Sequence, residues 1–122
     1  QAWEAGVVLT GVSAGAICWF EQGLTDSSSD ELRPLDCLGF ISGSCCPHYD
    51  GEPQRRPSYH RLLARGEIAA GVAIEDWTAI HYRGAEIHRV IASKPGARAY
   101  SLRSVYGSVQ EVPLPVEYLD QP

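Results

Sequence analysis

A Gly-x-Ser-x-Gly motif directly after an apolar run constrains this chain more than any other feature. The run is Val7–Val12, the motif is Gly11–Gly15, and the segment Ala14–Gln22 that follows favours a helix. A strand, a sharp turn and a helix in this order form a nucleophile elbow, where two glycines leave room for the chain to double back. Ser13 is then the candidate nucleophile, and the Ala14 N–H at the helix start is the candidate oxyanion donor. A glycine-rich turn with an incidental serine is the alternative.

Two further apolar runs lead to side chains that could serve such a serine. Leu38–Ile41 leads into a Gly/Cys/Pro-rich loop that contains His48, and Gly71–Ile74 is followed directly by the acidic pair Glu75–Asp76. The carboxyl ends of neighbouring parallel strands lie side by side in an open α/β sheet. A serine nucleophile needs a base within hydrogen-bond reach, and an imidazole base needs a carboxylate to fix its tautomer. The sequence therefore predicts that Ser13, His48 and one of the two acids meet at one sheet edge.

The other histidines fit the role of the base less well. His60 lies in a predicted helix, and His81 and His88 alternate with apolar residues on predicted strands.

The choice between the two acids stays open at this point. Successive side chains of a strand face opposite ways, so only one of Glu75 and Asp76 can face His48.

The remaining segments predict an α/β fold. Pro57–Arg65 suits a helix that ends before Gly66. The polar stretch Leu24–Asp30 predicts a mobile loop. Four β-rich segments separated by glycine turns predict antiparallel hairpins; they cover 78–82, 86–91, 98–102 and 109–112. We expect one domain over residues 1–122, with a mostly parallel sheet flanked by helices and antiparallel β hairpins at its C-terminal end. Gln1–Gly6 resembles the last turn of a helix with a glycine cap, which indicates that the chain starts within the domain.

Composition narrows the classes of partner. The net charge is −5, from 15 acidic and 10 basic residues. A nucleic-acid surface needs a basic patch, so small molecules or peptides are the expected partners. No apolar run reaches the roughly 20 residues of a membrane span, and no secretory signal precedes Gln1, so a cytoplasmic protein that binds no membrane is expected.

Four cysteines raise the question of a metal site. They are Cys18, Cys37, Cys45 and Cys46. Their spacing lacks the Cys-x-x-Cys pairs of most zinc sites, so buried, reduced thiols and no bound metal are expected. A cluster of Cys45, Cys46 and His48 keeps a metal-binding module open as an alternative.

Four segments of this chain resemble the peptidase E family of serine peptidases, which includes aspartyl dipeptidases and cyanophycinases. Gly11–Ala16 is similar to the elbow of that family, Cys46–Tyr49 to its Pro-His-aromatic segment and Gly71–Asp76 to the strand that carries its acid. The likeness continues through Lys94–Tyr100. It therefore covers nearly the whole chain.

The resemblance implies a function, a fold and roles for further residues. It implies a cofactor-free Ser-His-acid peptidase acting on short peptides, with dipeptides bearing N-terminal aspartate as the expected substrates. The implied sheet is flavodoxin-like and akin to that of class I glutamine amidotransferases. The resemblance favours Asp76 over Glu75 as the acid, and Arg55 and Arg56 as ligands of the substrate carboxylate, which a guanidinium can bind through two bonds.

The resemblance also implies partners. This chain lacks the N-terminal half of the family's domain, including a Gly-Gly-Asn segment that would supply a second oxyanion donor. That half is expected to be required, and a homo-oligomer is a further expectation. The alternative function is a non-catalytic, amidotransferase-like domain that binds a ligand without turnover.

Overall fold

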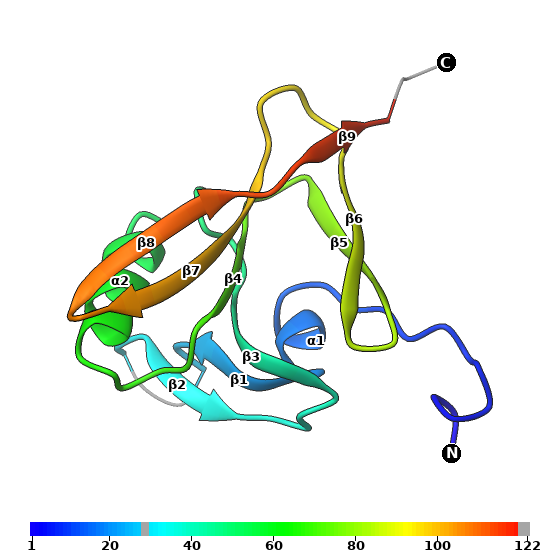
Figure 1. Ribbon diagram of the computed structural model, residues 1–122, viewed down its shortest axis with the longest axis horizontal. Helices are drawn as coiled ribbons and strands as arrows, with labels where there is room; N and C mark the ends of the chain where they lie inside the picture. Colours follow the sequence, from blue (N-terminus) through cyan, green and yellow to red (C-terminus); the bar gives the residue numbers. More distant parts are fainter. Residues whose placement is uncertain (28–29, 120–122) are drawn as a thin grey trace.

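The structure is a computed structural model that describes residues 1–27 and 30–119 (Figure 1). It is an α/β fold with two sheets and few helices. In chain order the elements are α1 (Ala14–Ile17), β1 (Phe20–Thr25), β2 (Arg33–Asp36), β3 (Ile41–Cys46), α2 (Arg55–Ala64), β4 (Gly71–Ile74), β5 (Thr78–Arg83), β6 (Glu86–Ala92), β7 (Ala99–Val105), β8 (Ser108–Pro113) and β9 (Val116–Tyr118). Neither described helix is long enough to cross a bilayer.

The larger sheet has six strands in the order β2-β1-β3-β4-β7-β8, and the smaller has three in the order β5-β6-β9. β1, β3 and β4 are parallel to one another, whereas β2, β7 and β8 join antiparallel. The larger sheet is therefore mixed, and the expectation of a mostly parallel sheet is corrected. The reason is that the two hairpin strands β7 and β8 extend this sheet, while only β5, β6 and β9 form a sheet of their own.

Both faces of β3 and β4 are covered, as expected for central parallel strands. On one face Cys46 and Ala73 pack in a cluster with Tyr59, Leu63 and other buried residues. On the other face Cys45 and Val72 pack with Ile17 and Phe20. These clusters fix β3 and β4 side by side, so the two chain segments that leave their carboxyl ends are also neighbours.

The helix α2 confirms the prediction of a helix near Pro57–Arg65. It starts at Arg55 and ends at Ala64, and Gly66 follows with a φ of 69°. Pro57 lies in its first turn, where a missing N–H costs no hydrogen bond. Figure 1 shows α2 beside the hairpin of β7 and β8, and its Tyr59 and Leu63 pack on the face of the larger sheet that carries Cys46 and Ala73.

The predicted strand over Val7–Val12 is not formed. This segment is irregular, and Val8 and Val12 are 84% and 83% exposed. No strand of residues 1–27 and 30–119 pairs with it, and an isolated strand has no partner for its backbone groups. The expectation of a strand buried on both faces is therefore wrong for this chain by itself.

The predicted helix over Ala14–Gln22 is shorter than expected. α1 ends at Ile17, and the chain enters β1 at Phe20. β1 continues to Thr25 and buries Leu24 completely, so the first part of the predicted loop Leu24–Asp30 is strand. Residues 28 and 29 of that loop lie outside the described residues. Pairing with β3 on one side and β2 on the other explains why this segment is extended.

The C-terminal hairpins and the N-terminal turn agree with the sequence. β5 with β6 and β7 with β8 are antiparallel pairs. The first residues form a helical turn closed by Gly6, whose φ is 81°. The Gly6 N–H donates to the Trp3 carbonyl and the Val7 N–H to the Ala2 carbonyl, each at 3.0 Å, which is the bonding pattern of a Schellman cap. The strand predicted over Leu38–Ile41 begins only at Ile41.

Candidate active site

Ser13 lies in a sharp turn directly before α1. Its φ of 55° and ψ of −117° are strained for a residue with a Cβ, at a cost on the order of 1–3 kcal/mol. The Gly15 N–H donates to the Val12 carbonyl at 2.9 Å, which closes the turn around the serine. A Cβ on Gly11 would lie 1.9 Å from the Gly15 carbonyl oxygen, whereas a Cβ on Gly15 would meet open space. The turn therefore requires Gly11 for a close approach but places no such demand on Gly15.

His48 lies two residues beyond the carboxyl end of β3, and its φ of 54° is also positive. Two backbone hydrogen bonds hold the loop there. The Tyr49 N–H donates to the Ile74 carbonyl at the end of β4, and the Glu52 N–H donates to the His48 carbonyl, both at 3.1 Å. The loop is thus fixed to the neighbouring parallel strand, and this strand leads to Asp76.

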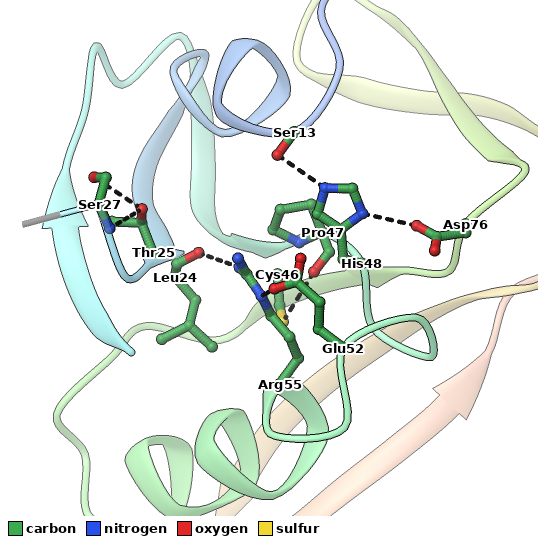
Figure 2. A network of polar contacts seen from close by, with 10 residues as sticks. All are labelled: Ser13, Leu24, Thr25, Ser27, Cys46, Pro47, His48, Glu52, Arg55 and Asp76. Carbon is green, nitrogen blue, oxygen red and sulfur yellow. Dashed lines mark hydrogen bonds and ion pairs between the residues drawn. The ribbon is translucent and has the colours of Figure 1, made fainter. Parts of the chain in front are cut away.

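The structure brings Ser13, His48 and Asp76 together (Figure 2). Ser13 Oγ lies 2.9 Å from His48 Nε2, and Asp76 Oδ1 lies 2.8 Å from His48 Nδ1. All three side chains are partly exposed. In this order the carboxylate accepts from Nδ1–H, which leaves Nε2 free to accept the serine proton.

Asp50 and Gly51, in the loop after His48, hold Asp76 in place. Asp50 Oδ1 accepts the Asp76 N–H at 2.8 Å. The backbone of Gly51 is so close that a Cβ there would lie 2.0 Å from Asp76 Oδ2. The turn after His48 therefore wraps around the carboxylate that His48 contacts. In the sequence, Gly51 directly after Pro47–Asp50 is the feature that indicates such a close turn.

Glu75 faces a different set of groups from Asp76. Its Oε1 accepts a hydrogen bond of 3.0 Å from the Tyr100 hydroxyl, and its backbone N–H donates to the Arg98 carbonyl. Burial raises the pKa of the Glu75 carboxyl, and the nearby Asp50 charge adds to this effect. In this geometry Asp76 is the acid in contact with His48.

The Ala14 N–H is free to bind an anion. Among residues 1–27 and 30–119 no backbone carbonyl accepts a hydrogen bond from it. It belongs to the residue directly after Ser13, which is where an elbow presents one of its oxyanion donors.

The two arginines occupy different environments. Arg55 is 5% exposed; its Nη1 donates to the Leu24 carbonyl at 2.6 Å and its Nε to Glu52 Oε1 at 2.8 Å (Figure 2). Arg56 is exposed, donates to the Glu111 carboxylate and lies over the rings of Tyr49 and Tyr100. Only Arg56 presents its guanidinium at the surface.

The remaining histidines make contacts with residues other than Ser13. His60 contacts Tyr49 and Glu111. The rings of His81 and His88 pack edge to face on the β5–β6 hairpin, with centroids 5.0 Å apart. His48 is the histidine in contact with the candidate nucleophile.

The cysteines are free, and two of them are buried. Cys45 and Cys46 lie on opposite faces of β3 in the two core clusters. Burial raises the pKa of both thiols, to about 12 for Cys46. A zinc ligand must be a thiolate, and His48 already contacts Ser13 and Asp76, so this arrangement favours structural thiols.

A cavity of about 760 Å³ lies beside Ser13 and His48. Its walls come from the irregular N-terminal segment, from α1 and the start of β1, and from β5. Most of these residues are apolar; they include Val7, Val8, Trp19, Phe40, Ile80 and Tyr82. Neither Arg55 nor Arg56 lines it.

A partly exposed serine, histidine and aspartate joined in this order is the arrangement of a serine hydrolase. The chain matches the model of Peptidase family S51 over residues 1–90. It is 47% identical over 119 residues to the protein named "Uncharacterized peptidase YgaJ" of Bacillus subtilis (strain 168). The aligned residues make up 98% of this chain and 51% of that protein. The chain therefore belongs to peptidase family S51, which confirms the resemblance to the peptidase E family. It spans about half the length of this curated relative. No solved structure gives a significant match.

Proposed function

We propose that this chain carries the nucleophile, base and acid of a serine peptidase. His48 Nε2 takes the Ser13 hydroxyl proton while Oγ attacks the scissile carbonyl, and Asp76 stabilises the resulting imidazolium. The imidazolium then gives its proton to the leaving amine, which leaves an acyl-enzyme on Ser13. Water, activated by His48, releases the acid and restores the serine. The Ala14 N–H binds the oxyanion formed in both steps.

One observation carries this proposal: Ser13 Oγ, both nitrogens of His48 and Asp76 Oδ1 form an unbroken chain of hydrogen bonds of 2.9 and 2.8 Å. Ser13 and His48, both members of this chain of hydrogen bonds, are two of the four non-glycine residues with a positive φ in the described part of the protein. Strain of this kind persists where the surrounding structure holds a residue in place, and it concentrates at functional sites.

The test is covalent labelling and hydrolysis by the intact natural protein. A fluorophosphonate should label Ser13, and Ser13→Ala should remove both labelling and hydrolysis of short peptides while leaving the melting temperature unchanged. His48→Ala should be about as damaging as Ser13→Ala, and the double variant no worse than either, because members of one catalytic unit fail together. A folded protein that binds peptides but neither labels nor hydrolyses would instead support the alternative, a non-catalytic, amidotransferase-like domain.

We propose dipeptides with N-terminal aspartate as substrates, with Arg56 as the ligand of the aspartate side chain. Arg56 supports this because its guanidinium is exposed while it donates to Glu111, whereas the guanidinium of Arg55 is buried. Arg56→Ala should lower kcat/KM for an Asp-initiated dipeptide at least tenfold more than for a neutral one, a difference of about 1.4 kcal/mol. Equal losses on both substrates would refute this role, and Arg55→Ala tests the alternative ligand.

We also propose that the apolar cavity is covered in the intact protein by further chain. The relative's greater length and the exposed Val8 and Val12 support this. In the intact protein the parallel strands β1, β3 and β4 would then belong to a sheet akin to that of class I glutamine amidotransferases. The added chain would supply the second oxyanion donor. A second copy of this chain on the same face would be the other outcome, and the oligomeric state in solution distinguishes the two.

A further inference from the structure

A second polar cluster lies next to the Ser13–His48–Asp76 chain and is centred on Glu111 of β8. Its carboxylate accepts hydrogen bonds from the Tyr49 hydroxyl and from Arg56. His60 Nε2 lies 2.9 Å from the Tyr49 hydroxyl and 3.2 Å from Glu111 Oε1. Residues from the His48 loop, from α2 and from β8 therefore meet at one carboxylate.

Tyr49 connects this cluster to His48. It follows His48 directly, is 3% exposed, and its backbone N–H is bound to the Ile74 carbonyl. Its ring packs against Tyr59 and Tyr100. Tyr49 is thus fixed at its backbone by the bond to Ile74 and at the tip of its side chain by the hydrogen bond that its hydroxyl donates to Glu111. A residue held this way limits the positions that its neighbour His48 can take.

The charges of the cluster favour one direction for the hydrogen bond. Burial raises the pKa of the Tyr49 hydroxyl, and Glu111 raises it further, so this hydroxyl stays protonated and donates. Partial burial would raise the pKa of the Glu111 carboxyl, but hydrogen bonds from Tyr49 and His60 and the charge of Arg56 outweigh it and lower this pKa. Glu111 is therefore an ionised acceptor at neutral pH.

We propose that Glu111 is a positioning residue, which holds Tyr49 and thereby sets His48 between Ser13 and Asp76. This inference rests on the proposed function. Glu111 lies beyond residues 1–90, the part that matches the family model, so the anchor comes from the C-terminal hairpin of this chain. Because a small misplacement of a base can cost up to 10²-fold in rate, an anchor of this kind controls turnover without touching substrate.

The experiment compares Tyr49→Phe, Glu111→Ala and Glu111→Gln in the intact natural protein. Tyr49→Phe removes one hydroxyl and keeps the buried ring, and Glu111→Gln keeps one acceptor. We expect kcat to fall roughly 10- to 100-fold in Tyr49→Phe and Glu111→Ala, KM to change less than twofold on a neutral dipeptide, and Glu111→Gln to lie between wild type and Glu111→Ala. Gln110→Ala is the matched control. Gln110 precedes Glu111 on β8, but its side chain accepts a hydrogen bond from Arg103, its partner on β7.

A second measurement does not depend on turnover. The proton shared by His48 Nδ1 and Asp76 gives a downfield NMR signal, which should broaden or shift in Tyr49→Phe and Glu111→Ala but not in Gln110→Ala. An unchanged signal in both variants would overturn the proposal, whatever happens to kcat. An unchanged kcat with a lower melting temperature would also overturn it, because the cluster would then only stabilise the fold. If wild type hydrolyses no peptide, the proposed function fails while the NMR signal still decides whether Glu111 positions His48.

Discussion

At the scale of single residues, the site depends on backbone positions that ordinary side chains avoid. Ser13 and His48 both have positive φ values, and both are held by bonds to neighbouring segments. Gly11 and Gly51 allow the close approaches that these positions require. The arrangement of Ser13, His48 and Asp76 thus depends on two glycines that carry no functional group.

Replacing each elbow glycine tests this dependence. Gly11→Ala would put a Cβ 1.9 Å from the Gly15 carbonyl oxygen, so the turn must open and Ser13 must move. We expect Gly11→Ala to reduce fluorophosphonate labelling at least 100-fold. Gly15→Ala is the matched control, since its Cβ meets nothing within 4 Å, and it should retain labelling within a few-fold. Equal sensitivity at both glycines would contradict the geometry of this turn.

The two adjacent acids provide the second test. Asp76→Asn should lower kcat by several orders of magnitude, because an amide cannot hold the His48 tautomer or stabilise its cation. Glu75→Gln should leave kcat within about tenfold, since Glu75 bonds to Tyr100 and not to His48. The kcat values of the two variants on one dipeptide check this. A larger loss at Glu75 would reverse the assignment.

At the scale of elements, the site lies where the carboxyl ends of β3 and β4 meet the turn before α1. β3 and β4 are parallel neighbours, so His48 and Asp76, each two residues past a strand end, start side by side. The helix α2 and strand β8 hold the His48 loop in place, because Arg56 of α2 and Tyr49 of the loop both donate hydrogen bonds to Glu111 of β8. This support joins segments that are about 60 residues apart in the chain.

The Glu111 contacts should make stability depend on pH. The folded-state pKa of Glu111 is below its ordinary value of 4.5, so its contribution is fully present above that value and is lost as pH falls through the lowered pKa. The free energy of unfolding of wild type should therefore exceed that of Glu111→Gln most at pH 7, and the gap should shrink below about pH 4.5. Urea unfolding at several pH values measures it, with Gln110→Ala as control. A gap that is constant or grows at low pH would contradict this linkage.

At the scale of the whole molecule, one face is left open. The apolar cavity and the irregular segment Val7–Val12 lie together, and this segment is the run that the sequence predicts to be a buried strand. Contiguous exposed apolar surface of this kind marks an interaction surface. We therefore expect residues 1–122 in isolation to aggregate or to label weakly with a fluorophosphonate.

A single charged substitution tests whether this face is buried in the intact protein. Val8 is 84% exposed here, so Val8→Asp should not change the stability of residues 1–122 alone. In the intact protein it should lower the melting temperature by several degrees or more, because an unpaired buried charge is costly. Val112→Asp is the control, at a valine that is 56% exposed on β8. Equal effects of both substitutions in the intact protein would show that the Val8 face stays open.

The sequence by itself determined the local features of this protein. The Gly-x-Ser-x-Gly turn, the helix that ends before Gly66 and the alternating hairpin strands are set by glycine, proline and side-chain periodicity, and these act within a few residues. The positions of His48 and of the Glu75–Asp76 pair after apolar runs were readable for the same reason, whereas the run before Ser13 forms no strand in this structure.

Only the tertiary structure decided which long-range partners each segment has. The run Val7–Val12 has strand-forming residues but no described neighbour to pair with, whereas Phe20–Thr25 becomes strand because β2 and β3 flank it. The same holds for Glu111, which is an unremarkable acid in an alternating strand until the fold places it against Tyr49. Backbone pairing and buried polar contacts need groups from distant parts of the chain, so no local pattern specifies them.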